Sequence, residues 1–254
     1  MNSKYKSIEL SGYFKIIETC VSKPYKSTSK LRKSMNMKIV SQTRLRIFSL
    51  ISIGGLFLYA GITRMSGQFS ISSLQQNPLN LQVDVIRQSR GTSCGEAVIT
   101  MIFNYAHPQT PISEQEVIDY AAAHGYYIEV PPFTSPANMV KIAQYYANDV
   151  STGTVNNSDQ GLVLLIQNLR RGDPVIIDVL SNFNDPESEA HFIVVTGISV
   201  DPNRENAVVI HYNDPLTGTK ESSDWAGNVG VWNAWQNNGD PGGPGWWLVI
   251  SSSS

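Results

Sequence analysis

Cysteine is scarce in this sequence, because only Cys20 and Cys94 occur among 254 residues. Two cysteines cannot form a disulfide framework, and they cannot supply a metal site made of several thiolates. The sequence therefore predicts no metal, no cofactor and no disulfide. Cys20 lies in an N-terminal segment that we expect to be outside the folded domain, so Cys94 is expected to be the only thiol of that domain.

Basic residues are scarce after residue 64. Residues 1–64 contain 12 of the 19 Lys and Arg but only 2 of the 21 Asp and Glu, so residues 65–254 keep 7 basic and 19 acidic side chains. A domain that binds nucleic acid is expected to show a basic face. The acidic balance of the larger part argues against nucleic acid as a partner, and the basic N-terminal part needs a separate explanation.

The uncharged hydrophobic run at residues 47–63 offers that explanation. It is short for a membrane span and slightly long for the apolar region of a signal peptide, and residues 1–46 before it are basic. Positive charge on that side places the N-terminus in the cytoplasm and the rest of the chain outside. No clean A-x-A cleavage site follows, which favours a membrane anchor over a cleaved signal peptide, while a core helix fits the basic flank less well. A start at Met35 or Met37 would leave a compact basic region before the run.

The folded domain is expected to span residues 81–254, after a polar linker at residues 64–80. Its first half is helical in pattern and its second half is mostly β. This order predicts an α+β domain in which N-terminal helices pack on an antiparallel sheet. Helices are predicted after Ser93, after a capping box at Ser113 and Glu116 as far as Gly125, from Pro136, and over 161–171; strands are predicted at 174–180, 191–200, 207–212 and 245–250.

Cys94 lies at the beginning of the first predicted helix. An alternating run at residues 81–86 predicts a half-buried strand before it, and a small-residue turn follows. Ser93 and Glu96 have the S-x-x-E spacing of a capping box, so Ser93 would be the N-cap and Cys94 would lie in the first turn. The unpaired N–H groups and the positive end of the helix dipole there favour a thiolate. A buried, inert cysteine is the alternative.

A thiolate nucleophile needs a base and usually a third group that orients the base. Of the four histidines, His191 begins an apolar strand, and the facing strand ends near Asp214. A turn centred near residues 203 and 204 brings His191 within register error of Asp214, whereas His211 faces Thr196 inside the ladder. An Asp beside the imidazole would hold its tautomer and stabilise the imidazolium. Alternatively, His191 is a surface residue at a strand end and Asp214 belongs to an ordinary turn.

These residues carry a family resemblance. Gln88 lies six positions before Cys94, which begins a Cys-Gly-x-Ala helix; His191-Phe-Ile-Val-Val-Thr-Gly and Asn213-Asp-Pro-Leu-Thr-Gly218 follow in that order. The set resembles the C39-like cysteine peptidases of the papain-like superfamily, although the interval from His191 to Asp214 is slightly long for that family. The resemblance implies a papain-like cysteine protease fold. It also implies Cys94 as nucleophile, His191 as general base and acid, Asp214 as orienting group, and Gln88 with the Cys94 backbone N–H as oxyanion hole.

The activity implied is that of a thiol hydrolase, membrane-anchored or secreted, which cleaves a peptide or protein substrate through an acyl-enzyme outside the cytoplasm. The best-known C39 domains cut after double-glycine leaders and are fused to transporters, which this sequence does not show, so that substrate is not carried over. A phytochelatin-synthase-like acyl transferase and a non-catalytic module that binds peptides or cell-wall fragments remain alternatives. Five tryptophans near the C-terminus could line a substrate cleft or anchor the core, and the Gly-rich loop at residues 240–245 has no assigned role.

Overall fold

The computed structural model describes residue 74 and residues 77–131, 133–204 and 207–251, all of which belong to one compact unit, Gly67–Ser254. The predicted basic segment at residues 1–46 and the hydrophobic run at residues 47–63 lie outside the described residues. Among those that the structure describes, no helix is both long enough and apolar enough to cross a membrane.

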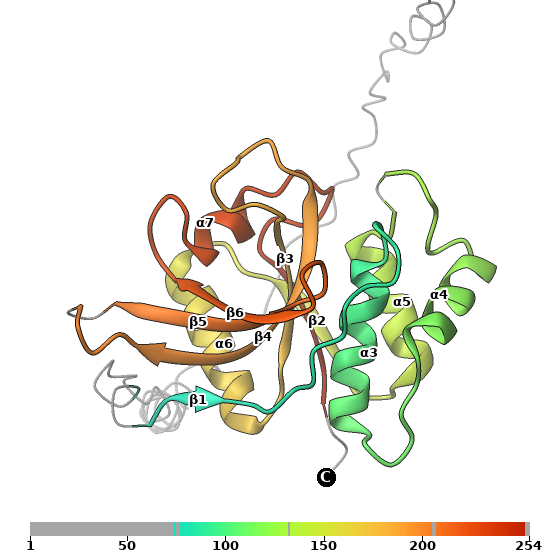
Figure 1. Ribbon diagram of the computed structural model, residues 1–254, viewed down its shortest axis with the longest axis horizontal. Helices are drawn as coiled ribbons and strands as arrows, with labels where there is room; N and C mark the ends of the chain where they lie inside the picture. Colours follow the sequence, from blue (N-terminus) through green and yellow to red (C-terminus); the bar gives the residue numbers. More distant parts are fainter. Residues whose placement is uncertain (1–73, 75–76, 132, 205–206, 252–254) are drawn as a thin grey trace, which may run out of the picture. The chain divides into compact units, whose positions relative to one another are not determined.

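Three helices in the first half of this unit lie together on the right of Figure 1. They are α3 (Cys94–Ala106), α4 (Glu114–Ala123) and α5 (Pro136–Tyr146). The predicted capping box of Ser113 and Glu116 begins α4, and Ser135 caps α5 ahead of Pro136. Further along the chain come α6 (Ser158–Arg171) and the short α7 (Val231–Gln236). Gly172, with a φ of 86°, ends α6 as predicted, but α6 begins three residues before the predicted Gly161 because Asn157 caps it.

Seven strands form one antiparallel sheet in the order β2-β7-β3-β4-β5-β6, and β1 pairs separately with β4. The strands are β1 (Leu79–Asn80), β2 (Val150–Thr154), β3 (Val175–Leu180), β4 (Ala190–Val200), β5 (Val208–Asp214), β6 (Thr219–Asp224) and β7 (Trp246–Ile250). The predicted α+β class is therefore confirmed. The predicted strand at residues 81–86 is wrong, because the strand before α3 is the two-residue β1, and the chain after it runs outside the sheet.

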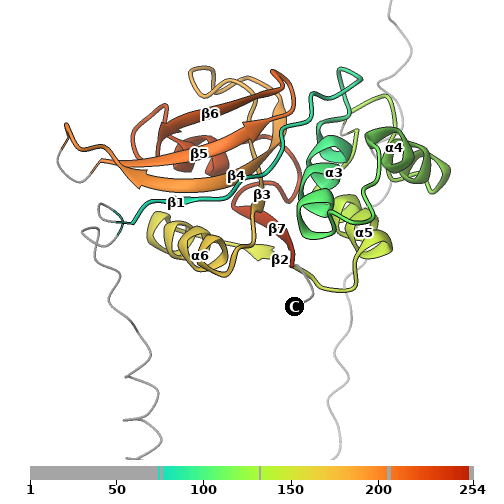
Figure 2. The ribbon, with the colours of Figure 1, turned by 60° about the horizontal axis from the view of Figure 1, so that its bottom comes forward.

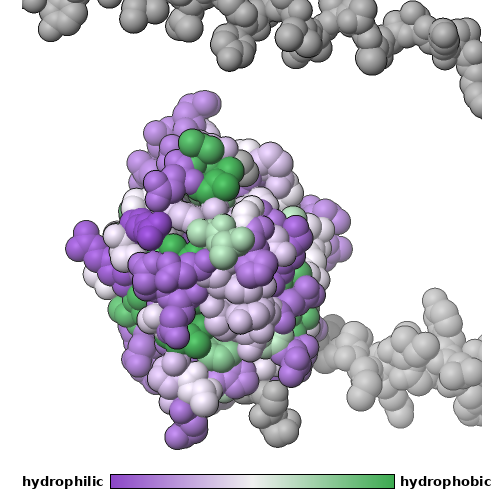
Figure 3. Space-filling model, turned by 90° about the vertical axis from the view of Figure 1, so that its right-hand side faces the viewer, coloured by the Kyte–Doolittle hydropathy of each residue, from purple (hydrophilic) through white to green (hydrophobic). Residues whose placement is uncertain are grey.

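Helices cover both faces of the sheet, as the rotated view in Figure 2 shows. One hydrophobic cluster joins α3, α4 and α5 to residues such as Phe192 and Val194 of β4. The other cluster joins α6 and α7 to the opposite face, where Ile193 and Tyr212 lie. Figure 3 shows the side of the molecule that is on the right in Figure 1 as mostly hydrophilic, with hydrophobic residues in small separate patches. The helices there turn their apolar sides toward the sheet.

The tryptophans belong to the core. Trp225, Trp235 and Trp246 are buried, and the indole N–H of Trp235 donates to the carbonyl oxygen of Trp246 at 2.7 Å. None of the five lines the cavity beside Cys94 that is described below. Of the two roles open from the sequence, core anchoring is the one that the structure supports.

A β-bulge at Thr196 interrupts the pairing of β4 with β5. On the turn side of the bulge Gly197 faces His211, and beyond it Val195 faces Tyr212, so Thr196 has no partner residue in β5. The expected pairing of His211 with Thr196 is thus wrong by one residue. The register on the turn side of the bulge therefore differs by one residue from the register at the open end of the hairpin.

This bulge decides which way His191 points. Side chains alternate between the faces of a strand, so a ladder without the bulge would place Val194 opposite Asp214 and turn His191 away from it. With the bulge, Val194 faces Asn213 instead. His191 and Asp214 therefore lie on the same face of the sheet, together with Ile193 and Tyr212.

Candidate functional site

Cys94 is the first residue of α3, as predicted, and its side chain is half-buried. Ser93 precedes it as N-cap, but the predicted capping box is wrong: the Ser93 side chain makes no capping hydrogen bond. Glu96 is fully buried and accepts a hydrogen bond from the Thr134 hydroxyl at 2.7 Å. Glu96 turns into the core rather than back to the N-cap. No capping box therefore occupies the backbone N–H groups at the start of α3.

Glu114, the first residue of α4, holds the loop that leads to Cys94. Its two carboxylate oxygens each accept from the Ser89 N–H at 3.0 Å, and one accepts from the Ser93 hydroxyl at 2.7 Å. Hydrogen bonds to a carboxylate are stronger than those between neutral groups. The loop between residues 88 and 93 is therefore fixed at both of its ends to the helical side of the molecule.

The structure brings His191 and Asp214 together. His191 lies near the start of β4 and Asp214 is the last residue of β5, and Nε2 of His191 is 2.7 Å from Oδ1 of Asp214. Both residues are buried. The same carboxylate accepts from the Leu216 N–H at 2.8 Å, and Gly218, with a φ of 71°, closes the turn by donating its N–H to the Asp214 carbonyl. The carboxylate is thus held in place from two sides.

Burial works against charge on the His191 ring, but hydrogen bonds to Asp214 and Cys94, together with their negative charges, more than offset it and raise the pKa of His191 to about 10. Burial likewise opposes the charge on Asp214, while His191 and the N–H groups of the turn lower its pKa. At neutral pH the geometry therefore favours a protonated ring between a carboxylate and the sulfur. Asp214 uses Nε2, so Nδ1 is the ring nitrogen left for Cys94.

Gln88 lies in the extended segment that enters α3. Its backbone N–H donates to the carbonyl oxygen of Pro215 at 2.8 Å, which ties the segment to the residue after Asp214. Its side-chain amide nitrogen donates to the carbonyl oxygen of Arg90 at 2.8 Å, and its amide oxygen is buried without a hydrogen-bond partner. One amide N–H of Gln88 is consequently engaged in the loop, and the second remains to serve another acceptor.

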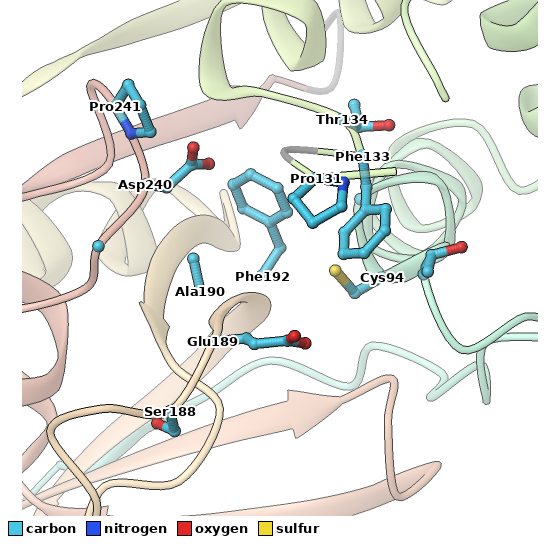
Figure 4. Close-up of a pocket in the computed structure, with 13 residues that line it drawn as sticks. Cys94, Pro131, Phe133, Thr134, Ser188, Glu189, Ala190, Phe192, Asp240 and Pro241 are labelled. Atoms are coloured by element: carbon cyan, nitrogen blue, oxygen red, sulfur yellow. The ribbon is translucent and has the colours of Figure 1, made fainter. Parts of the chain in front are cut away.

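A cavity of about 320 Å³ opens beside Cys94. Figure 4 shows Cys94 on one side of it and Asp240 on the other, with Phe192, Pro131 and Phe133 between them. The lining residues come from the start of α3, the segment before α5, the start of β4 and the loop before β7. The cavity is thus bounded by elements from both the helical side and the sheet.

The other histidines lie apart from this cavity. The ring of His211 is 2.8 Å from the Ser199 hydroxyl within the β4–β5 ladder, in keeping with its expected structural role. His107 and His124 contact the aromatic rings of Phe103 and Tyr120. Among the described residues, no group of three or more His, Cys, Asp and Glu could hold a metal ion.

Several acidic residues around the site could not be found from sequence. Glu96, Glu114, Asp178 and Asp240 are buried, yet in the sequence each looks like an ordinary polar residue. Burial raises the pKa of Glu96 to about 7 and that of Asp240 to about 6, although hydrogen bonds with Thr134 and Asp178 respectively lower these values in part. The only available signal was positional, because Glu96 follows Cys94 closely and Asp240 lies in a Gly-Pro loop.

Comparison with known proteins identifies the family of the chain. A search of the curated proteins finds no match for the chain. The model of the Peptidase_C39 like family matches residues 80–240, which is more than half of the chain and includes Gln88, Cys94, His191 and Asp214. The chain therefore belongs to the Peptidase_C39 like family, whose membership carries a peptidase-like function in the broad sense.

Proposed function

We propose that the protein is a cysteine peptidase of papain-like arrangement, which hydrolyses a peptide bond through an acyl-enzyme on Cys94. One observation carries the proposal: His191 contacts Asp214 through Nε2 at 2.7 Å and also interacts with Cys94, which begins a helix. A base that is oriented on one side and contacts a thiol on the other is the arrangement that activates a sulfur nucleophile. Membership of the family supports the same activity.

In the proposed reaction the sulfur of Cys94, paired with the protonated His191 ring, attacks the carbonyl carbon of the scissile bond. The resulting oxyanion is stabilised by the Cys94 backbone N–H at the start of α3 and by the amide of Gln88. His191 then gives its proton to the leaving amine, which departs and leaves a thioester. Water, deprotonated by His191, hydrolyses the thioester, and Asp214 keeps the ring in its orientation throughout.

The proposed role of Gln88 has support from its surroundings. Its backbone is tied to Pro215, and one N–H of its amide is tied to Arg90. An amide fixed in this way is preorganised, so its remaining N–H could meet the oxyanion without reordering the loop.

Digestion of a mixed peptide library, followed by mass spectrometry, tests the proposal. We expect the native protein to generate new N-termini, and Cys94→Ala to generate none above background. A matched control is the buried, remote Val208→Ala, which should fold less stably but still cleave. A Cys94→Ala protein that cleaved the library at the native rate would refute the proposal.

Adding a primary amine to the same digestion separates the alternatives. Hydrolysis yields free carboxyl ends, whereas an acyl transferase would yield amide products as the amine replaces water. A non-catalytic binding module would yield neither product and would leave Cys94 slow to react with iodoacetamide near pH 6. The proposed peptidase gives free acids and fast alkylation that is lost in His191→Ala.

We further propose that the domain acts outside the cytoplasm and is held at a membrane by residues 47–63. The support is the basic segment followed by an uncharged run in the sequence. Protease added to intact cells and to lysed cells provides the test. Digestion of the domain only after lysis would contradict an extracytoplasmic location.

A further inference from the structure

The cavity beside Cys94 has an acidic end. Asp240 forms part of its wall opposite Cys94, and Glu189 lines it nearer to the sulfur (Figure 4). No Lys or Arg is among the residues that line it. The wall between the two ends is apolar and comes mainly from Phe133, Phe192 and prolines. A group bound here would therefore meet Glu189 near the sulfur, then an apolar wall, and the Asp240 carboxylate at the far end.

A second carboxylate lies behind Asp240. Asp178, on β3, is fully buried, and neither of its carboxylate oxygens has a hydrogen-bond partner. Asp240 is 9% exposed, and its Oδ1 is also buried without a partner. Burial and the neighbouring Asp240 raise the pKa of Asp178 well above its ordinary value. Asp178 and Asp240 thus form a pair of neighbouring buried acids, in which Asp178 keeps its proton to higher pH than Asp240 does.

The surrounding backbone keeps these acids in place. The amide of Asn238 donates to the carbonyl oxygen of Asp178 at 2.8 Å and to that of Trp235 at 3.0 Å. A Cβ at Gly243 would come within 2.3 Å of an Asp178 carboxylate oxygen, so the Gly-rich loop packs directly on the pair. Burying two acids is costly, and the charge of His191 offsets that cost at Asp178 only in part. An apolar residue at position 178 would fill the space without that cost, which indicates that the pair has a use.

We propose that Asp240, backed by Asp178, is a subsite that takes the cationic end of a lysine or arginine side chain of the peptide substrate. The apolar wall would cover the methylene stem, and the charged head would pair with the ionised Asp240 carboxylate. The distance along the cavity, from Cys94 to Asp240, would then select a basic residue close to the cleaved bond. This inference rests on the proposed function for its substrate, a peptide, but the binding it predicts does not need turnover.

Binding to Cys94→Ser protein tests the subsite without cleavage. The probes are fluorescein-labelled tetrapeptide pools in which one position is fixed as lysine, arginine, norleucine or glutamate and the others are mixed. Fluorescence anisotropy should show, at one position, lysine or arginine pools binding roughly tenfold or more tightly than the norleucine pool, which has the same apolar stem. Asp240→Asn should reduce that ratio to near one. Glu187→Gln, which changes an exposed acid one residue before Ser188 of the cavity wall, should leave the ratio unchanged.

A pH series on the Cys94→Ser protein covers the case in which Asp240→Asn does not fold. The groups around Asp240 are Asp178 on β3, His191 on β4, which acts on Asp178, and Glu189 before β4. The lysine-to-norleucine ratio should grow as the pH rises from 5 to 7, because the proton leaves Asp240 in this range. Equal binding of the two pools at every position, or no binding of any pool, would overturn the subsite. Cleavage of the pools by native protein is measured separately. Cleavage without a preference for basic residues would overturn only the subsite proposal. Selective binding without cleavage would overturn only the proposed peptidase activity.

Discussion

His191 and Asp214 each stabilise the charged form of the other, which raises the pKa of His191 and lowers that of Asp214. Asp214→Asn keeps an acceptor for the Leu216 N–H but loses the charge that supports the protonated ring. We expect the turnover number to fall by about 10³-fold or more, in line with losses seen when the orienting acid of a triad is replaced. Steady-state kinetics measures this, with thermal unfolding as a check on folding. A fall of less than threefold would show that Asp214 does not orient the base.

Glu96 should make stability depend on pH. Its pKa in the folded protein is raised by burial from 4.5 to about 7, so its stabilising contribution is complete below 4.5 and is lost as the pH rises through 7. Glu96→Gln, which can still accept from Thr134, should remove this loss and raise the free energy of unfolding at pH 8 by roughly 2–3 kcal/mol. Urea unfolding at pH 4.5 and pH 8 measures the change. An equal change in the free energy of unfolding at both pH values would contradict a raised pKa of Glu96.

Among single residues, those at recognisable element ends could be predicted from sequence. Cys94 follows a helix N-cap, and the spacing of the hairpin predicted that His191 and Asp214 would lie near its open end. The bulge at Thr196, which turns both side chains to one face, was not predicted. The acids Glu96 and Asp240 could not be predicted, because nothing local distinguishes a buried carboxyl group from an exposed one. Their burial depends on Thr134 and on β3, which are distant in sequence.

At the scale of elements, α4 controls the loop before α3 through its first residue. Ser89 and Ser93 donate hydrogen bonds to the two carboxylate oxygens of Glu114. In Glu114→Gln, an NH₂ group, which can only donate, takes the place of one of these oxygens. We expect the loop to loosen, so that the turnover number falls about tenfold, because positioning groups act through geometry, whereas the fold is kept. The neighbouring exposed Gln115→Ala is the matched control. Unchanged kinetics in Glu114→Gln would mean that the loop holds its position without the carboxylate.

The pairing of β1 with β4 depends on a glycine. A Cβ at Gly197 would lie 2.6 Å from the carbonyl oxygen of Leu79, a backbone atom that cannot turn aside. Gly197→Ala should therefore displace β1 and lower the free energy of unfolding by about 1–3 kcal/mol. Hydrogen exchange should show faster exchange at residues 79–81 and little change in α5. Protection of β1 equal to that of the native protein would contradict the close approach.

Elements with strong end signals could be predicted, and those without such signals were missed. The capping box of Ser113 and the Ser135-Pro136 pair predicted two helix starts correctly, because capping is local chemistry. The strands β2 and β6 were missed because both are polar edge strands without a clear apolar alternation. The predicted capping box at Ser93 failed because burial of Glu96 overrides its local spacing.

At the scale of the whole molecule, the site lies where two hydrophobic clusters meet. Cys94 belongs to α3, whose hydrophobic cluster covers one face of the sheet. His191 lies near the start of β4, and its side chain is on the other face. Met101, on α3, lies in the first cluster and is 3.9 Å from the side-chain amide of Asn213, next to Asp214. Packing between helix and sheet therefore sets the distance from sulfur to ring.

Met101→Ala tests this dependence. We expect the free energy of unfolding to fall by about 2–4 kcal/mol, as for other large-to-small changes in a core. The rate of Cys94 alkylation should fall as well, even where the protein remains folded, because α3 can shift against β5. Met101→Leu, which keeps the side-chain volume, should leave both the free energy of unfolding and the rate of Cys94 alkylation close to those of the native protein. A destabilised protein with an unchanged alkylation rate would show that the site does not depend on this packing.

The bulge at Thr196 makes the β4–β5 hairpin tolerant to a change of chain length at one position. Removal of Thr196 would still leave Val195 facing Tyr212 and Gly197 facing His211, since Thr196 has no partner in β5. Removal of Ile193 would instead reverse the side chain of His191, because every residue before it would exchange faces. Single-residue deletions should therefore spare activity at Thr196 and abolish it at Ile193. Over evolutionary time, insertions and deletions in this strand would then be expected to collect at the bulge.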